Sequence, residues 1–230
     1  MPNHTANNFT ITGPLVDIHR FIKAVKNDKS NLDFNGVVPM PVDLEGTTSP
    51  VRIQTQQDID NIWADWNKKK EAGELDEWQL KEGKPWGLGM TQEKHDQLLA
   101  KYGFTNWYDW AIANWGTKWN AYDVGEWLMD EGGNGHGRAT IYYETAWNPV
   151  TRLWLKVSKD YPTLEFFHEF ADEGGWFLGD ETIVNGEIIN SNEYDWNSDD
   201  GITLREGLGR YHPEDEDEDE EEEKTDEVKN

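Results

Sequence analysis

An α+β fold built on one antiparallel sheet is the fold class that the sequence predicts, because alternating strand patterns flank two helical patterns. Residues 8–12 alternate and end at Gly13, and residues 164–170 alternate again. Apolar residues recur at helical spacing over residues 15–25 and again over residues 150–157. Strand-helix-strand units of this kind are typical of a split βαβ arrangement. We therefore expect a ferredoxin-like antiparallel sheet with two helices on one face.

The first strand passes directly into the first helix. Pro14 suits the first helical position, because its fixed φ angle is helical and its missing N–H has no partner there. Asp17 in the first turn and Lys26 at the end complement the helix dipole. Residues 32–38 are then predicted to form a second strand, which Pro39 stops.

Residues 55–116 are predicted to be an all-helical block inserted between strands. Its first amphipathic helix includes Trp66 and closes at residues 68–70. We interpret these three lysines as favourable charge at a helix C-terminus rather than as a nucleic-acid patch. Thr91 is placed to cap another helix, which Gly103 ends.

The stretch from residue 102 to residue 127 holds five of the thirteen tryptophans. As a helix that begins near Thr105 and ends near Gly116, it gathers apolar side chains on one face. These are Phe104, Trp107, Tyr108, Ala111 and Trp115. We interpret this face as a core rather than a ligand cage. Trp110 lies off the face, so it is expected at the rim of the core or in contact with a partner.

The C-terminal half is predicted to hold most of the sheet. Residues 119–129 and 139–143 are expected to be extended segments joined by a glycine-rich hairpin loop. Pro149 begins the second helix of the sheet. Asn185 and Gly186 form a strong hairpin turn signal between two further strands.

Three parts follow from these elements. A ferredoxin-like domain is expected over residues 1–190, with its helical insert at about residues 55–116. Residues 191–213 are predicted to be a loosely docked polar arm, and residues 214–230 a disordered acidic tail.

An excess of acids is the strongest signal in the composition. The formal net charge is −25, and it is still −15 when the segment from residue 214 onward is left out. Such a chain is repelled by nucleic-acid phosphates and by anionic lipid, so neither is expected as a direct partner. Basic protein surfaces attract it. The chain has no cysteine and no apolar run of bilayer length, which predicts a cytoplasmic protein.

An unbroken run of ten acids lies near the C-terminus. It comprises Glu214, Asp215, Glu216, Asp217, Glu218, Asp219, Glu220, Glu221, Glu222 and Glu223. One interpretation is a solubilising tail. The other is a polyanion that occupies a basic nucleic-acid channel. Acids on an extended chain lie about 3.3–3.6 Å apart, close to the roughly 3.4 Å per phosphate of one DNA strand.

No catalytic, metal or cofactor motif stands out. His168 and Glu169, with Asp172 and Glu173, could ligate a metal, but His168 and Glu169 on a strand point to opposite faces, so a solvated strand end is the preferred interpretation. Acid pairs such as Asp180 and Glu181 are expected by chance in so acidic a chain. We predict no enzyme activity, no cofactor and no metal.

Several stretches resemble those of a known family. The most specific is the string Trp115-Gly116-Thr117-Lys118-Trp119-Asn120. The others are residues 1–3, 9–14, 34–41, 102–104, 107–110 and 145–149. On these residues the chain resembles the YubB-like family of ferredoxin-like proteins carried by bacteriophages and plasmids, as far as about residue 190. The resemblance implies the fold and a mobile-element origin, and hence the cytoplasm of a bacterial host. It implies no activity.

A non-enzymatic interaction protein is the function class that these patterns favour. We expect it to bind and inhibit a host nucleic-acid-handling protein, such as a defence nuclease, by nucleic-acid mimicry. The acidic run and Trp110 would make the contact. The alternative is a single-stranded nucleic-acid or nucleotide-binding module that stacks bases on sheet aromatics such as Tyr142 and Phe167. A weak hydrolase built on the acid pairs is a third interpretation, resting only on their abundance.

Overall fold

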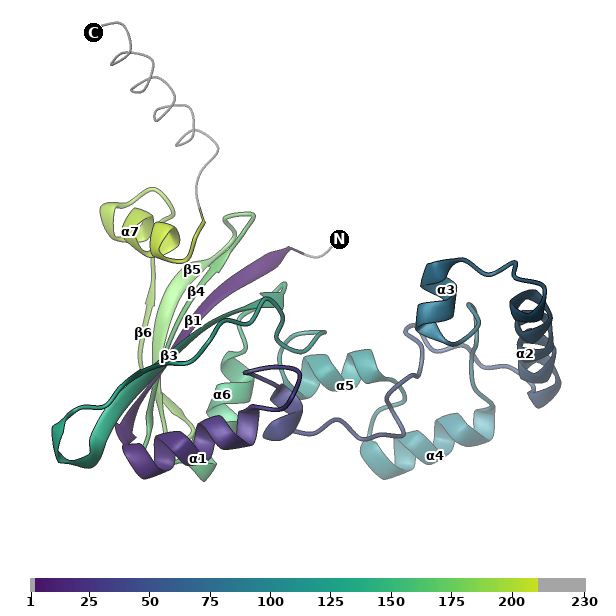
Figure 1. The fold of residues 1–230 in the computed structure, drawn as a ribbon, viewed down its shortest axis with the longest axis horizontal. Helices are drawn as coiled ribbons and strands as arrows, with labels where there is room; N and C mark the ends of the chain where they lie inside the picture. The colour runs from purple at the N-terminus through teal and green to yellow at the C-terminus, as the bar shows by residue number, and fades with distance from the viewer. Residues whose placement is uncertain (1–2, 211–230) are drawn as a thin grey trace, which may run out of the picture. The chain divides into compact units, whose positions relative to one another are not determined.

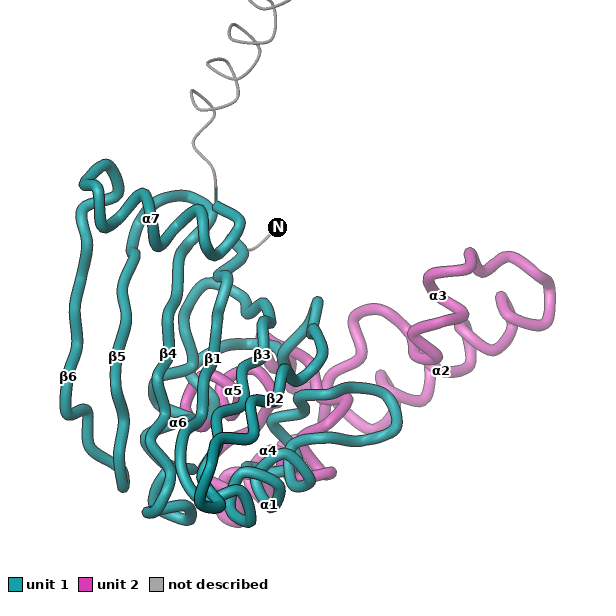
Figure 2. Tube along the Cα trace, turned by 60° about the vertical axis from the view of Figure 1, so that its left-hand side comes forward, with its two compact units in different colours: residues 1–38, 115–230 teal, residues 39–114 magenta. Residues whose placement is uncertain are grey.

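Two compact units make up the chain in the computed structural model, which describes residues 3–210. The first consists of residues 1–38 and 115–230, and the second of residues 39–114 (Figure 2). The expected insert at residues 55–116 thus corresponds to a longer unit that begins at Pro39. No helix among residues 3–210 is long and apolar enough to cross a membrane.

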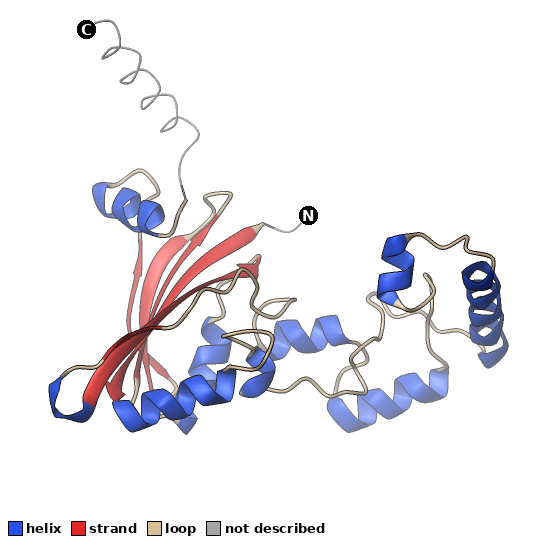
Figure 3. Cartoon of the chain, in the orientation of Figure 1, coloured by secondary structure: helices blue, strands red, loops and turns tan. Residues whose placement is uncertain are grey.

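One antiparallel sheet forms the centre of the first unit (Figure 3). Its six strands lie in the order β2-β3-β1-β4-β5-β6, with every neighbouring pair antiparallel. In chain order they are β1 (His4–Pro14), β2 (Leu128–Asp130), β3 (His136–Ala146), β4 (Glu165–Asp172), β5 (Leu178–Val184) and β6 (Glu187–Glu193). The predicted hairpin turn at Asn185 and Gly186 joins β5 to β6, and the glycine-rich loop joins β2 to β3.

Seven α-helices lie among the described residues (Figure 1). The sheet unit contains α1 (Leu15–Val25), α6 (Thr151–Val157) and α7 (Asp199–Gly207). The second unit contains α2 (Gln56–Glu71), α3 (Glu77–Glu82), α4 (Gln92–Tyr102) and α5 (Trp107–Asn114).

Helices α1 and α6 cover one face of the sheet, as a ferredoxin-like fold predicts. Phe9 of β1 stacks on Trp154 of α6 with ring centroids 4.2 Å apart, and Phe21 of α1 lies 6.1 Å from the same tryptophan. The opposite face carries α7. There Leu208 packs with Ala6 of β1 and with residues of β4 and β5. Ala6 and Phe9 differ by an odd number of positions, so their side chains point to opposite faces.

The helix ends of the second unit follow the sequence signals closely. Thr91 accepts a hydrogen bond from the backbone N–H of Lys94 at the start of α4. Gly103 follows the helix in the left-handed conformation, with φ of 75°. At the start of α5, however, the side chain of Asn106 accepts the backbone N–H of Asp109 at 2.9 Å, so Asn106 rather than Thr105 caps this helix.

The strand predicted at residues 32–38 is absent, and that prediction is wrong. A single 3₁₀ turn, η1 (Phe34–Gly36), takes its place. The side chain of Asp33 accepts the N–H of Asn35, and the N–H of Phe34 donates to the side chain of Asn120 at 2.9 Å. Because these backbone donors are satisfied locally and by Asn120, no partner strand is needed.

The tryptophan-rich string quoted for the family resemblance has a structural role within the sheet unit. Trp115 donates its indole N–H to the carbonyl of Val38 at 2.9 Å, and Thr117 donates to the carbonyl of Ala146 at 2.8 Å. The string therefore fixes the loop that contains η1 and the end of β3. Residues 119–129 are mostly irregular rather than extended, and only their last residues enter β2.

The loosely docked arm predicted for residues 191–213 is also incorrect over its described part. Strand β6 continues to Glu193, and α7 follows. Arg205 and Leu208 are buried, because α7 packs against the sheet. Residues 211–213 and the predicted acidic tail at 214–230 lie outside the described residues.

Candidate functional site

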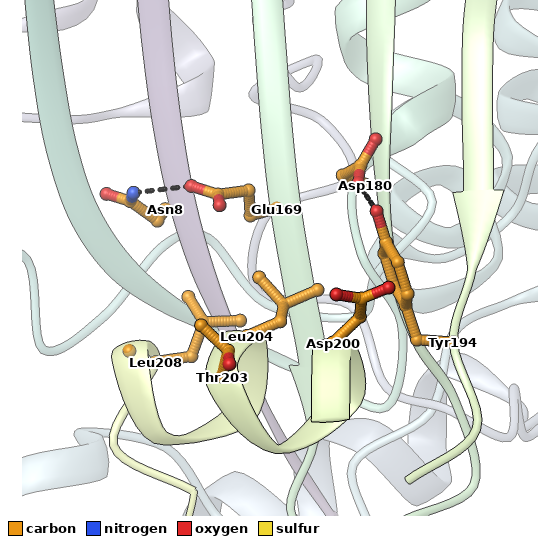
Figure 4. Close-up of a pocket in the computed structure, with 9 residues that line it drawn as sticks. Asn8, Glu169, Asp180, Tyr194, Asp200, Thr203, Leu204 and Leu208 are labelled. Atoms are coloured by element: carbon orange, nitrogen blue, oxygen red, sulfur yellow. Dashed lines mark hydrogen bonds between the residues drawn. The ribbon is translucent and has the colours of Figure 1, made fainter. Parts of the chain in front are cut away.

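A cleft of about 430 Å³ lies between α7 and the sheet (Figure 4). Three carboxylates line it, from β4, β5 and the first turn of α7: Glu169, Asp180 and Asp200. The other lining residues are Asn8, Tyr194, Thr203, Leu204, Gly207 and Leu208. Among residues 3–210, no lysine, arginine or histidine lines the cleft, so the charged groups that these residues contribute are all negative.

The floor of the cleft is a row of polar residues that lie side by side across neighbouring strands. Asn8 of β1 pairs with Glu169 of β4, which pairs with Asp180 of β5, which pairs with Asn192 of β6. Since residues paired across antiparallel strands point to the same face, all four side chains face α7. The register of the sheet thus creates the row.

Hydrogen bonds hold two of the carboxylates in place. Asn8 donates to Glu169 at 2.7 Å. Tyr194 donates its hydroxyl to Asp180 at 2.6 Å, and the amide of Asn192 donates to the other oxygen at 2.9 Å. Asp180 is only 7% exposed, so its charge is stabilised by two neutral donors rather than by a cation. These carboxylates can therefore accept a cationic donor from outside.

The pKa of Tyr194 reports on this arrangement. The hydrogen bond to Asp180 is the main cause that raises it to about 12, followed by burial and by the negative charges nearby. Ionising the phenol would remove the donor that Asp180 accepts and would place two negative charges side by side. Tyr194 therefore stays a neutral hydrogen-bond donor through the physiological pH range.

Helix α7 forms the roof of the cleft, and local contacts fix it. Ser198 accepts the N–H of Gly201 at its N-terminus. Leu208 and Leu204 pack on Ala6 and other apolar residues of the sheet. The guanidinium of Arg205 donates to the backbone carbonyls of Trp196 and Arg210, both at 3.3 Å, so it is turned away from the cleft carboxylates.

Behind the cleft, a buried polar network occupies the other face of the sheet. His168 donates from Nδ1 to Glu181 at 3.0 Å, and its Nε2 lies 3.0 Å from the side-chain oxygen of Asn7. The Asn7 amide nitrogen donates to the backbone carbonyl of Thr5 at 2.8 Å, which sets the orientation of the amide. Nδ1 of His168 therefore faces the carboxylate of Glu181 and Nε2 faces the side chain of Asn7, so both ring nitrogens have hydrogen-bond partners in the core.

This network corrects the interpretation of His168 as part of a solvated strand end, because its side chain is fully buried. It also separates the acid pair at residues 180–181. Asp180 faces the cleft, whereas Glu181 faces the core. Successive side chains of a strand point to opposite faces, so the cleft carboxylate and the buried carboxylate lie on different sides of the sheet. Among residues 3–210, no three histidine, aspartate or glutamate side chains are grouped so as to hold a metal ion.

None of the described residues that line this cleft was predicted to contact a partner. Trp110 is 6% exposed and therefore belongs to the core of its unit, so its expected place at a rim or contact surface is wrong. The physical reason is the rotation of α5, which buries Trp110 and Ala111 and leaves Trp107 and Tyr108 partly exposed. The acidic run from Glu214 to Glu223 lies outside the described residues.

The cleft residues were missed because the sequence does not show strand register. Asp180 and Glu181 are visible as an acid pair, and Asn8 as a polar residue in a strand. Only the pairing of β1, β4, β5 and β6 brings them into one row. The usable signal was the alternation of polar and apolar residues along β4, where Glu169 lies between His168 and Phe170.

Comparison with known proteins places this architecture in a family. The model of the ferredoxin-like domain in Api92-like protein matches residues 114–229, which span β2 to α7. A crystal structure of the protein api92 from Yersinia pseudotuberculosis is similar, with a TM-score of 0.44 and 12% identity over 84% of this chain and 98% of that chain. No curated protein matches. By its match over residues 114–229, the chain belongs to the family of the ferredoxin-like domain in Api92-like protein.

Proposed function

We propose that this protein is a non-enzymatic, acidic interaction protein that binds a basic surface on another protein. The observation that carries the proposal is the cleft under α7, in which Glu169, Asp180 and Asp200 present negative charge and no basic residue of the described part of the chain lines the cleft. Carboxylates held by neutral donors are suited to pair with an arginine or lysine of a partner, because the partner supplies the missing positive charge.

Electrostatic steering supports the same proposal. A net charge of −25 creates a field that attracts basic surfaces and speeds their association. Proteins that handle nucleic acid present such surfaces. We therefore propose that the target is a host nucleic-acid-handling protein, and that occupation of its basic channel inhibits it by nucleic-acid mimicry. The run from Glu214 to Glu223 contributes ten of the chain's negative charges.

The biological setting belongs to the same proposal. The resemblance to proteins carried by bacteriophages and plasmids favours a mobile-element protein that acts in a bacterial cytoplasm. We therefore propose that the target is a host defence protein that recognises foreign DNA, because its inhibition would protect such an element.

The alternative, base stacking on the sheet, has less support from the geometry. Tyr142 packs against the apolar cluster beneath α7 and donates its hydroxyl to Glu144 at 2.8 Å. Glu169, the carboxylate beside it across β1, would repel a phosphate approaching this face.

An affinity capture from nuclease-treated bacterial lysate tests the proposal. The baits are the full-length chain, a chain that ends at Pro213, and the double variant Glu169→Gln with Asp180→Asn. The matched control is Glu187→Gln with Glu193→Gln, which removes the same charge from exposed positions on β6. Mass spectrometry identifies the retained proteins, and short DNA is added as a competitor.

The expected result is a stoichiometric nucleic-acid-handling protein that short DNA and salt displace. It should be lost or weakened by the cleft variant and retained by the control. Loss on truncation at Pro213 would assign the contact to the acidic run instead. A partner whose capture is insensitive to both salt and DNA would refute nucleic-acid mimicry.

A further inference from the structure

A second hollow, of about 390 Å³, lies within the unit of residues 39–114. Three tryptophans line it, namely Trp78, Trp86 and Trp107, and the first two are unusually exposed. Trp86 is 79% exposed and Trp78 is 51% exposed, and their ring centroids lie 6.0 Å apart at 63°. Large aromatic side chains are normally buried on folding, so two exposed rings beside one hollow indicate a surface built for a flat ligand. We name it the tryptophan groove.

The local structure holds both rings at the surface. Trp78 lies on α3, which begins with a capping box at Asp76 and ends at the left-handed Gly83. Trp86 follows Pro85, whose own ring is buried. Because the segment is fixed at these points, neither ring needs to be ordered by the ligand. A preformed aromatic surface lowers the entropy cost of binding.

Two cations lie in the same groove, although the chain as a whole is acidic. Arg52 is exposed, and no hydrogen bond or ion pair engages its side chain within the described part of the chain. Lys84 donates to the backbone carbonyl of Gly46 at 3.0 Å, which holds its ammonium beside the groove. Of the residues that the structure describes, Glu82 is the single acid that lines the groove.

We propose that the tryptophan groove binds short single-stranded nucleic acid. A base would stack on the exposed ring of Trp86 or Trp78, and Arg52 with Lys84 would contact the adjacent phosphates. Exposed aromatic faces next to cations are the general means by which proteins hold unpaired bases and their backbone. A proline-rich peptide would use the rings but would leave the two cations without a partner, so the nucleic acid fits the charges better.

The charge of the unit limits the affinity for nucleic acid and determines how that affinity depends on salt. The unit carries 13 acidic and 8 basic residues, so long polyanions gain little from it. Two phosphate contacts predict a slope of about −1.4 for the logarithm of the binding constant against the logarithm of salt concentration. A duplex hides its base faces, so it should bind at least tenfold more weakly than the single strand.

The test is fluorescence anisotropy of a labelled oligothymidylate of about ten nucleotides, titrated with the full chain over roughly 50 to 200 mM salt. Trp86→Ala should weaken binding by roughly 5- to 150-fold, the range measured for loss of one stacked base. Arg52→Ala should reduce the salt slope by about 0.7. Glu82→Gln should strengthen binding.

The matched control is Trp176→Ala, which removes a ring that is 82% exposed and lies on the sheet unit. It should leave the affinity unchanged. All of these side chains are exposed, so the variants should stay folded, which circular dichroism checks. The proposal is overturned by equal losses in Trp86→Ala and Trp176→Ala, by equal affinity for duplex and single strand, or by no binding at roughly 1 mM protein. Binding of a proline-rich peptide in place of the oligonucleotide would likewise overturn it.

Discussion

The buried pair of His168 and Glu181 offers the sharpest test of how the sheet is held. Both side chains are nearly inaccessible, and Nδ1 of His168 lies 3.0 Å from a carboxylate oxygen of Glu181. Replacing Glu181 by Leu leaves Nδ1 of His168 without its partner in the core, and replacing His168 by Leu leaves the carboxylate of Glu181 without its partner. Breaking a buried pair from one side typically costs about 3–5 kcal/mol.

The double variant, His168→Leu with Glu181→Leu, should be far less destabilised than the sum of the single variants. It removes both polar groups and leaves an apolar pair in the core, a change that is often neutral or stabilising by about 1–4 kcal/mol for a buried pair. The two residues are in direct contact, so their effects are expected to couple by roughly 0.5–3 kcal/mol or more.

Thermal unfolding followed by circular dichroism measures these effects on the sheet unit. A loss of about 3–5 kcal/mol corresponds to a fall of roughly 6–20 °C in Tm for a chain of this size. The control is Glu169→Gln, next to His168 but facing the cleft, which keeps its hydrogen-bond acceptor and should shift Tm little. A Glu181→Leu variant that unfolds within about 1 kcal/mol of the parent would refute the stabilising role of this buried pair.

Three further outcomes follow from individual contacts. Asp180→Asn should return the pKa of Tyr194 from about 12 toward its ordinary value, as measured by NMR titration of the tyrosine ring. Because the folded-state pKa is raised, the stability from this contact is present below about pH 10 and is lost toward pH 12, and the variant should lack this alkaline loss. Asn106→Ala should destabilise α5 by about 1 kcal/mol while Thr105→Ala has little effect, as shown by thermal unfolding. Leu208→Ala should cost about 2–5 kcal/mol and speed hydrogen exchange in α7, and unchanged exchange there would contradict the packing of this helix on the sheet.

Local signals predicted much of the fold. Thr91 and Gly103 bound α4 because a capping hydroxyl and a left-handed glycine act on their own neighbours. Asn185 and Gly186 mark the β5–β6 turn for the same reason, since both adopt positive φ. The sequence also predicted two helices on one face of an antiparallel sheet, because hydrophobic periodicity records which side of each element is buried.

Contacts between segments that are distant in the sequence determined the parts of the fold that local patterns did not predict. Residues 32–38 have a strand-like composition, yet the side chain of Asn120 takes the N–H of Phe34 and a 3₁₀ turn forms. Residues 191–210 look polar, yet Leu208 finds an apolar site on the sheet. Trp110 is buried because packing within its unit rotates α5 so that Trp110 and Ala111 face the interior. The helical pattern alone did not predict this rotation.

By itself, the sequence determined the fold class, the hairpin turns, most helix ends and the acidic character of the protein, because these depend on neighbours within a few residues or on composition alone. Only the tertiary structure decided the candidate site. Asn8, Glu169 and Asp180 come from three strands far apart in the chain, and they meet because antiparallel register places them in one row. The same alternation sends His168 and Glu181 to the core and leaves their neighbours Glu169 and Asp180 in the cleft. Register is fixed by the packing of whole faces, so no short stretch of sequence contains it.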